Sequence, residues 1–380
     1  MNISYVLQKN LVLFVIKSSF DESVLSIERW ANVKIPKRQA KKVIINAAKD
    51  FEEFYNHKKI ASIPSAIRRD LMILTSDGKG VVMLYYDLRF DPKKRASRQN
   101  RNNKLTKPKK SNSKRMATVA SVYETDRFIR EPKDIHNEFF NKSASKEKMK
   151  RPSPIAKRVW AGLENSSEYI IHKMFEEALQ RVDSVQKEWV VLVDGDRNQI
   201  ETIKKLARKF DKKLTIICDI IHILEYIFRF GKVLNDTDDV RKWVSDKFDM
   251  ILNGKSSYVA SGMKRSATCR KLKKTEREPV DSCARYLLNH SNYLHYDKYL
   301  KSGYPIATGV IEGACRYLVK DRMEITGARW SLSFAVALLK LRSIKISGDF
   351  DDYWKFYENQ EFYRNYQVLY KNPSMLKMPS

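Results

Sequence analysis

The central part of the chain contains two short apolar runs that each end at an aspartate. Trp189 to Val193 is continuously apolar and ends at Asp194, and Leu214 to Cys218 is a second run that ends at Asp219. Between them, residues 197–210 place apolar side chains at helical spacing. A continuous apolar run of this length is typical of a strand buried on both faces, and the strand–helix–strand order predicts parallel strands joined by a crossover helix. This region predicts an α/β fold.

Upstream of this unit, β-branched and alternating residues predict further strands. Residues 71–76 and 80–86 are joined by Asp77-Gly78-Lys79, whose Asp-Gly pair predicts a hairpin turn. A third strand is expected at residues 116–124 and a long helix at residues 164–188. The predicted order is β-β-β-α-β-α-β, a mixed sheet in which an antiparallel meander leads into parallel strands. In such a sheet the first and fourth strands are neighbours.

The remaining segments are predominantly helical. Patterns at residues 20–31 and 38–55 flank a turn that closes on Pro36, the outline of a helix-turn-helix, although a helical hairpin docked on a larger domain has the same pattern. A helix at 310–323 follows a long helical stretch. The expected organisation is an N-terminal helical DNA-binding region (1–66), the first part of the core (67–222), an α-helical insertion (223–304), the last part of the core (305–348) and an aromatic C-terminal helix (349–380). The aromatic residues of that last helix are expected to pack in the core or against another subunit.

The charge of the chain indicates a polyanionic partner. Its 380 residues include 73 Lys and Arg against 45 Asp and Glu, a formal net charge of +28. A field of this size attracts nucleic acid. Residues 91–114 alone hold ten Lys or Arg and one acid, with almost no apolar residues, which predicts a loop that contacts phosphate.

The expected DNA contacts are cations on the second N-terminal helix, in the basic loop and on the helix after the insertion. On that last helix, Glu312, Arg316 and Lys320 follow one another at intervals of four residues and share one face. The full set is Lys37, Arg38, Lys41 and Lys42, then Lys93, Lys94, Arg95, Lys109 and Lys110, then Arg316, Lys320 and Arg322.

Neither a membrane span nor a disulfide framework is expected. The apolar run Leu11 to Ile16 is too short to cross a bilayer and lacks the cleavage site of a signal peptide. The four cysteines are widely spaced, without the pairing typical of zinc sites. These features favour a reducing cytoplasm.

Three acids occupy positions that core packing does not explain: Asp77 at the expected hairpin, Asp194 at a strand end, and Glu312 early in its helix. Because the first and fourth strands are neighbours, Asp77 and Asp194 are expected side by side, with Glu312 added by the returning helix. Carboxylates this close raise one another's pKa unless cations hold them. Mg²⁺ or Mn²⁺ suits such ligands, and two ions form the clamp used in phosphodiester chemistry. Taken singly, Asp77 is equally explained as a turn former and Glu312 as a solvated helix residue.

Several motifs within residues 20–360 resemble the DDE transposases of bacterial insertion sequences, specifically the ISKra-type group. The most specific motifs follow the expected insertion, and others lie in the expected core. They are Tyr304 to Ile306, Gly309 to Cys315, Leu318 to Glu324, Gly327 to Ser331, Leu341-Arg342 and Gly348 to Phe350, together with Asp77 to Gly80, Lys114 to Val119, Lys157 to Trp160 and Asp219 to His222.

The resemblance implies an RNase H-like core with an α-helical insertion before the last catalytic acid. It maps the catalytic and metal-binding trio onto Asp77, Asp194 and Glu312. Competitors for the middle position are Asp196 and Asp219. Asp219 also belongs to a D-x-x-H motif, in which His222 would assist near the substrate.

The implied activity is Mg²⁺-dependent cleavage at the ends of an insertion sequence and strand transfer to target DNA, with two ions. The implied partner is double-stranded DNA, bound by a homodimer or higher homo-oligomer in the nucleoid of a bacterial cytoplasm. Two alternatives stay open. One is a nuclease or resolvase on the same fold. The other is a catalytically inactive or domesticated DNA-binding derivative, because members of that family usually carry more sequence ahead of the first helix pair.

Overall fold

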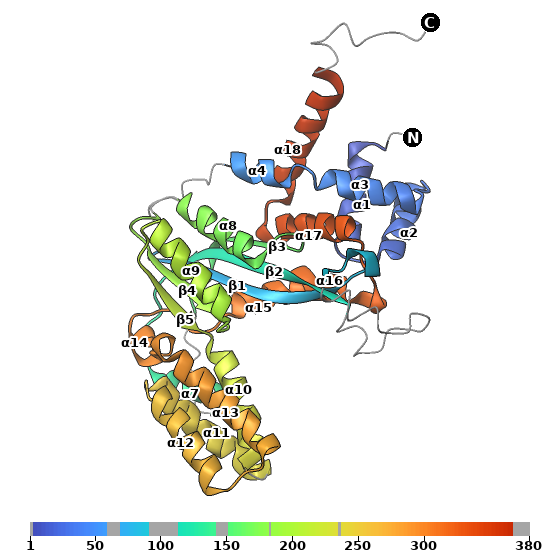
Figure 1. Ribbon diagram of the computed structural model, residues 1–380. Coiled ribbons are helices and arrows are strands. Elements are labelled where there is room, and N and C mark those ends of the chain that lie inside the picture. Colours follow the sequence, from blue (N-terminus) through green and yellow to red (C-terminus); the bar gives the residue numbers. More distant parts are fainter. Residues whose placement is uncertain are drawn as a thin grey trace, which may run out of the picture.

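The computed structural model describes residues 3–58, 69–90, 113–141, 151–181, 184–234 and 237–367. It shows an α/β protein built on a five-stranded mixed sheet, which confirms the expected fold class (Figure 1). The strand order is β3-β2-β1-β4-β5, with β1–β2 and β2–β3 antiparallel and β1–β4 and β4–β5 parallel. The strands are β1 (Leu71–Val82), β2 (Lys114–Thr125), β3 (Ile155–Gly162), β4 (Glu188–Val193) and β5 (Leu214–Cys218).

Helices surround the sheet and extend beyond it. Those before β5 are α1 (Tyr5–Val15), α2 (Phe20–Ala31), α3 (Lys37–Ala47), α4 (Phe51–His57), α7 (Pro132–Phe140), α8 (Ser167–Leu179) and α9 (Arg197–Lys209). Those after β5 are α10 (Ile220–Leu234), α11 (Thr237–Leu252), α12 (Ser256–Cys269), α13 (Lys274–Asn289), α14 (Tyr296–Lys301), α15 (Gly309–Ala314), α16 (Asp321–Met323), α17 (Leu332–Ser347) and α18 (Phe350–Phe362).

The parallel half of the sheet follows the sequence pattern closely. β5 has the expected bounds, β4 begins one residue before the expected run, and α9 ends one residue early. Trp189 is buried and the four residues after it have no exposed surface, as the continuous apolar run indicates. β4 lies beside β1, so the first and fourth strands are neighbours. The strand expected at 116–124 is present within β2.

The expected hairpin at Asp77-Gly78-Lys79 is wrong. β1 runs through these residues without a turn, and Asp77 pairs with Val119 of β2. The glycine instead permits close approach of a β2 side chain, because a Cβ on Gly78 would lie 3.3 Å from Met116 Cε. Asp77 therefore lies within a strand and not at its end.

Two further expectations upstream of β4 need correction. The sheet contains β3, an edge strand that the sequence pattern does not predict because its exposed start carries Lys157 and Arg158. The helix expected at 164–188 is shorter, since Ser166 caps the start of α8 and the helix ends at Leu179.

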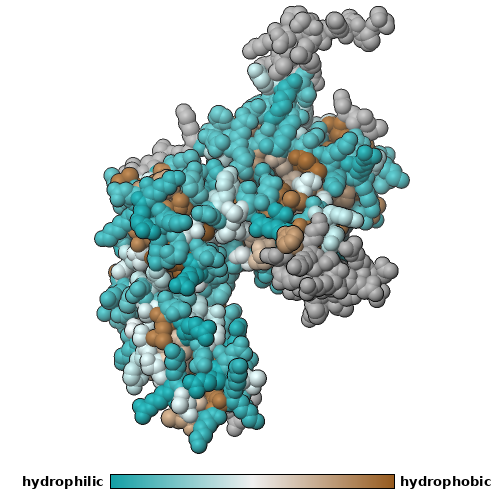
Figure 2. All heavy atoms as spheres, viewed as in Figure 1, coloured by the Kyte–Doolittle hydropathy of each residue, from teal (hydrophilic) through white to brown (hydrophobic). Residues whose placement is uncertain are grey.

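Figure 1 shows the sheet between helical layers and a helical arm projecting from one end. α8 and α15 both pack on β1 and β2, and α17 covers β3. The arm contains α10 to α14 together with α7, so the described residues within 223–304 form helices joined by short turns, with no strand among them. On the face drawn in Figure 2 most of the surface is hydrophilic, with apolar groups in small patches.

The two terminal regions pack against each other. The helix expected at 38–55 is divided into α3 and α4, and α3 packs on α17 through a buried face that includes Ala40 and Ile44. In α18 the aromatic residues Tyr353, Trp354 and Tyr357 are buried in the core, as expected, whereas Phe362 at its end is 53% exposed.

The helix expected at 310–323 is continuous but changes its winding. α15 leads into a π-helical turn, Cys315–Lys320, and then into α16. A π turn contains one more residue than an α turn. The regular four-residue face expected for Glu312, Arg316 and Lys320 is therefore interrupted, although all three side chains are exposed.

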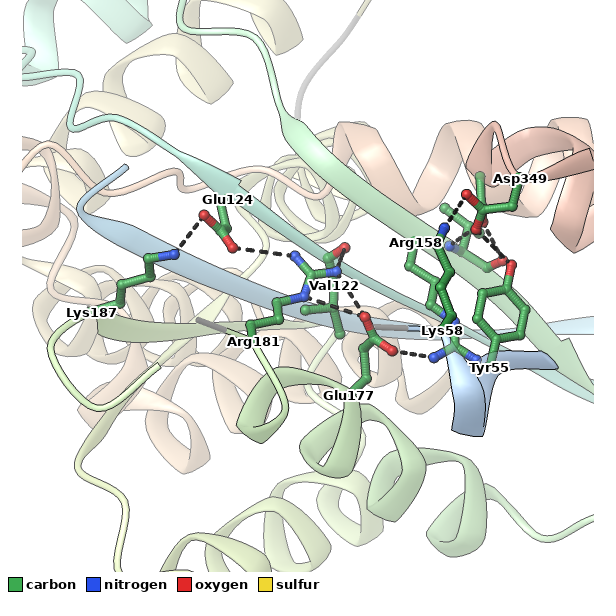
Figure 3. A network of polar contacts seen from close by, with 11 residues as sticks. Tyr55, Lys58, Val122, Glu124, Arg158, Glu177, Arg181, Lys187 and Asp349 are labelled. Carbon is green, nitrogen blue, oxygen red and sulfur yellow. Dashed lines mark hydrogen bonds and ion pairs between the residues drawn. The ribbon is translucent and has the colours of Figure 1, made fainter. Parts of the chain in front are cut away.

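A buried ionic network joins β2, β3 and α8 (Figure 3). Arg181 Nη2 lies 3.1 Å from Glu177 Oε1, and Lys187 Nζ lies 2.6 Å from Glu124 Oε2. Arg158 pairs with the second oxygen of Glu177. Burial opposes ionisation of Glu177, but the charges of Arg158 and Arg181 outweigh it and lower the pKa of this carboxyl. Glu124 and Glu177 therefore each have a cation beside them.

Candidate active site

Asp77 and Asp194 are brought together by the pairing of β1 with β4. The parallel register ends at Thr75 opposite Leu192, and continuing it by two residues sets Asp194 opposite Asp77. Neighbouring strands lie about 4.8 Å apart, and residues in register project to the same face of the sheet. Burial, and then the charge of Asp77, raises the pKa of Asp194. The two side chains are thus close enough for the charge of Asp77 to oppose ionisation of Asp194.

Neighbouring groups orient both carboxylates. Asp77 Oδ1 accepts a hydrogen bond from the Gly78 amide at 2.6 Å, and its Oδ2 accepts one from the Cys315 thiol at 3.3 Å. Asp194 Oδ1 accepts from the Asp196 amide at 2.9 Å. Cys315 therefore links the helix of Glu312 to Asp77.

Glu312 approaches Asp77 and Asp194 from α15. The helix packs on β1 and β2, and the Glu312 side chain is exposed to solvent. Partial burial and the charges of Asp219 and Asp77 raise the pKa of Glu312, whereas His222 lowers it. The expected trio therefore shares one electrostatic environment, and an incoming group can reach Glu312.

Asp219 is the most enclosed acid of the cluster, with no exposed surface. Its Oδ1 accepts from the Ile221 amide at 2.7 Å, and its Oδ2 accepts from the Thr308 amide at 3.1 Å and from the Thr308 hydroxyl. The adjacent backbone is held as well, because the Ile220 amide donates to the Ile306 carbonyl at 3.0 Å. Asp219 therefore fastens the end of β5 to the segment that begins α15.

The three candidates for the middle acid differ in the hydrogen bonds that their carboxylate oxygens already accept. Asp196 is the N-cap of α9, where its Oδ1 accepts from the Gln199 amide at 2.9 Å. Asp219 accepts three hydrogen bonds from the protein. Asp194 accepts one at its Oδ1, and no donor to its Oδ2 is found among the described residues. This difference favours Asp194 as the acid available to a ligand.

His222 supplies positive charge to the cluster. Its Nδ1 lies 3.7 Å from Asp219 Oδ2, which is an ion-pair distance and too long for a hydrogen bond. The Asp219 carboxylate raises the pKa of His222 to about 9, although partial burial opposes the shift. At neutral pH the ring is therefore a cation, and an imidazole binds a metal only after it has lost this proton.

The residues present fit a metal ion that prefers oxygen ligands. Asp219, His222 and Glu312 could hold an ion, since one ligand atom from each lies within 4.8 Å of the others. The expected trio of Asp77, Asp194 and Glu312 is not among the described groups that meet this distance. Burial is the main reason that the pKa values of Asp194 and Glu312 are raised, and neighbouring acids add to it. A divalent cation such as Mg²⁺, which binds carboxylates and water, would offset both effects.

The helical arm supports the cluster, which the sequence pattern did not indicate. The Tyr286 hydroxyl donates to the Asp194 carbonyl at 2.7 Å, and the Tyr296 hydroxyl donates to the Cys218 carbonyl at 2.7 Å. Gly195 has a φ of 95°, and a Cβ there would lie 2.4 Å from the Tyr286 hydroxyl oxygen. The absence of a side chain lets the chain turn over Tyr286 directly after Asp194.

The cations expected to contact DNA differ in their exposure to solvent, and some lie outside the described residues. Arg316 and Lys320 are exposed beyond Glu312. Arg322 is only 2% exposed, and the expectation that it contacts DNA stays a prediction. Those exposed on α3 are Lys37, Arg38, Lys41 and Lys42, and those outside the described residues are Lys93, Lys94, Arg95, Lys109 and Lys110.

The comparisons with known proteins do not assign the chain to a family. No protein-family model matches it, and no curated protein matches it significantly. Within the described residues, no helix is both long enough and apolar enough to span a membrane.

Proposed function

We propose that this protein is a DDE-type transposase with an RNase H-like core, which cuts DNA at the ends of an insertion sequence and joins the freed 3′-hydroxyl to target DNA. The observation that supports the proposal is the parallel pairing of β1 with β4, because its register, continued two residues beyond Thr75 and Leu192, would set Asp77 beside Asp194. Glu312 lies on a helix packed against β1. The mixed sheet is compatible with such a core. The helical arm precedes the Glu312 helix, where the resemblance expects an insertion.

Asp77, Asp194 and Glu312 would hold two Mg²⁺ or Mn²⁺ ions. When bound, such ions activate the attacking hydroxyl and stabilise the leaving oxygen in phosphodiester chemistry. The pKa values of Asp194 and Glu312 are raised first by burial and then by neighbouring acids, which fits this assignment because a bound cation would offset both effects.

The chain itself orients the acids. Cys315 holds one oxygen of Asp77, and the contacts between Asp219 and Thr308 fix the start of the helix that carries Glu312. His222, as a cation, reduces the repulsion among the acids and suits a position near a phosphate.

Double-stranded DNA would approach along exposed cations, and a homodimer or higher oligomer would hold the two element ends. Arg316 and Lys320 follow Glu312 on the same helical segment. The α2–α3 pair would serve as a helix-turn-helix, in which Arg38, Lys41 and Lys42 lie on the exposed face of α3.

The proposal is tested by strand transfer, with the DNA that flanks the coding sequence as donor and a supercoiled plasmid as target. We expect products that require Mg²⁺ or Mn²⁺ and are lost in Asp77→Asn and Glu312→Gln, with DNA binding retained in both variants. Glu201→Gln is the matched control, since Glu201 is an exposed acid on α9 whose carboxylate lies 3.1 Å from Lys204 Nζ. Metal-dependent cutting without joining would indicate a nuclease or resolvase instead, and DNA binding without cutting would indicate a DNA-binding derivative.

A further inference from the structure

An open cavity of about 600 Å³ lies where the chain leaves β1, between the start of α2, α3 and the segment that connects α16 to α17. Its cationic lining residues are Lys37, Arg38, Lys41, Arg322 and Arg329. The lining residues include a single acid, Asp21, and this acid is already 2.7 Å from Lys37 Nζ. The cavity therefore carries an excess of positive charge.

Arg322 is the unusual member of this lining because it is buried. Its Nε donates to the Val15 carbonyl at 2.8 Å, and its guanidinium lies 5.0 Å from the centre of the Trp330 ring. Its Nη2 has no hydrogen-bond partner within the described residues. Burial lowers the pKa of Arg322 to about 10, and the guanidinium remains charged at neutral pH. Because Nη2 is itself buried, Arg322 contributes positive charge to the wall of the cavity and not an exposed donor.

The rest of the lining is apolar. Leu84 is 42% exposed, and Ile325 and Ala328 are partly exposed beside it. Behind them, the rings of Trp330 and Phe334 stack with centroids 5.7 Å apart. Cations next to apolar and aromatic surface form the combination that binds a phosphate together with its base. The volume falls within the range of about 300 to 1,000 Å³ typical of small-ligand pockets, so a single nucleotide fits and a duplex does not.

The cavity lies along the helix that starts at the acid cluster. Arg322 follows Glu312 by ten residues in the sequence, which corresponds to roughly 15 Å at the rise of an α-helix. Arg316 and Lys320 are exposed between them. A DNA strand that leaves the cluster along these cations reaches the cavity within a few nucleotides.

We propose that this cavity binds one unpaired nucleotide of a DNA strand, with its phosphate against Arg322 and Arg329 and its base on the wall formed by Leu84, Ile325 and Ala328. The properties of the cavity alone favour a nucleotide as its ligand. The inference that this nucleotide belongs to a DNA strand rests on the proposed function.

The proposal is tested with the full chain in EDTA, which prevents cleavage. Two probes are compared: a blunt duplex, and the same duplex with a short single-stranded overhang that contains 2-aminopurine. We expect the overhang to improve binding about tenfold through burial of the base against apolar side chains. The fluorescence of the analogue should rise, because its base leaves the neighbouring bases for an aliphatic wall. Lys41→Glu and Ala328→Trp should each remove this preference.

Lys42→Glu is the matched control, because Lys42 is exposed on the same helix but does not line the cavity. It should weaken binding of both duplexes equally and leave their ratio unchanged. These variants avoid Arg322, whose contact with Val15 makes it a risk for folding. A preference for the overhang that survives both Lys41→Glu and Ala328→Trp would overturn the proposal.

Competitors identify the chemistry and the source. Deoxyadenosine monophosphate should displace the overhang at concentrations where inorganic phosphate does not, and equal competition by phosphate would contradict a nucleotide site. Competition by the mononucleotide without any preference for the overhang would contradict the strand as its source. Failure of both duplexes to bind would contradict the proposed function, whereas normal strand transfer with no overhang preference would overturn this inference alone.

Discussion

The network around Glu177 and the cluster around Asp194 both set carboxylates against the central sheet, but they are balanced differently. In the network, Arg158 and Arg181 outweigh the effect of burial and lower the pKa of Glu177. In the cluster, burial and neighbouring acids raise the pKa of Asp194 and of Glu312. The network thus carries its counter-ions within the protein, whereas the cluster leaves negative charge to be compensated.

The difference separates charges that serve the fold from charges that serve a ligand. A buried charge without a partner costs several kcal/mol, so a charge used for structure is paired where it lies. Charge left in excess at an accessible place implies an ion or a substrate of the opposite sign. The cavity at Arg322 carries excess positive charge, and by the same argument it implies an anionic ligand.

The largest effect is expected from the middle acid of the cluster. Asp194→Asn should lower metal-dependent cleavage by roughly 10³-fold or more, as for other residues that act as part of one catalytic unit, while DNA affinity stays near that of the wild type. Asp219→Asn should keep measurable activity, because Asp219 already accepts three hydrogen bonds within the protein. If Asp194→Asn were active and Asp219→Asn inactive, Asp219 and not Asp194 would be the middle catalytic acid.

The next largest effect concerns stability and belongs to the network. Glu177→Gln leaves Arg158 and Arg181 without their shared carboxylate, so the free energy of unfolding should fall by about 3 to 5 kcal/mol. Denaturant titration measures the loss. Glu176→Gln is the matched control, since the neighbouring Glu176 forms only partly exposed ion pairs, which are worth less than about 1 kcal/mol. Equal losses in the two variants would remove the distinction between the network and a surface pair.

A smaller effect is expected where the fold supports the cluster. Thr308→Val removes the hydroxyl that donates to Asp219, so the Mg²⁺ concentration needed for half-maximal cleavage should rise about tenfold, the lower end of the range for residues that orient metal ligands. DNA affinity should stay the same, and Thr308→Ser should restore the metal dependence. If Thr308→Val lowered stability but left the metal dependence normal, the contact between Thr308 and Asp219 would serve only the fold.

The smallest effects are expected in the pH dependence of stability without metal. The raised pKa values of Asp194 and Glu312 mean that the folded state binds more protons than the unfolded state just above the usual values of 3.8 and 4.5. Their protonation stabilises the fold at low pH, and this contribution is lost as pH rises through the raised values. Asp194→Asn should flatten that decline in urea titrations performed in EDTA.

Glu177 should show the opposite dependence, because its folded pKa lies below the usual value of 4.5. Its contribution is present above that value and is lost as pH falls through the lowered one. Glu177→Gln should therefore flatten the acid side of the stability curve. The same slope in both variants would contradict the comparison between the two regions.

The parallel half of the sheet could be predicted because its strands are buried on both faces. A continuous apolar run such as Leu214 to Cys218 favours a buried strand, and the helix before it repeats its apolar face regularly. The antiparallel half was harder. Gly78 has the composition of a turn, but here it makes room for Met116, and that neighbour comes from a strand nearly forty residues away.

The individual acids of the candidate site could be predicted from strand ends and motifs, but their partners could not. Thr308, Tyr286 and Cys315 act through contacts across distant segments, and nothing in their local sequence distinguishes them from core or surface residues. The burial of Arg322 was missed for the same reason, since it depends on packing against Trp330 and the backbone of α1. The catalytic trio itself stays a prediction.

The π turn between Glu312 and Arg322 sets an angle as well as a distance. Each residue of an α-helix rotates the chain by about 100° around the axis, since one turn takes about 3.6 residues. A π turn contains one more residue than an α turn, so removing one residue from Cys315–Lys320 would restore a regular α-helix. Arg322 would then keep close to the face that meets Val15. Inserting a further residue would instead rotate Arg322 by about 100° relative to Glu312 and take it away from Val15.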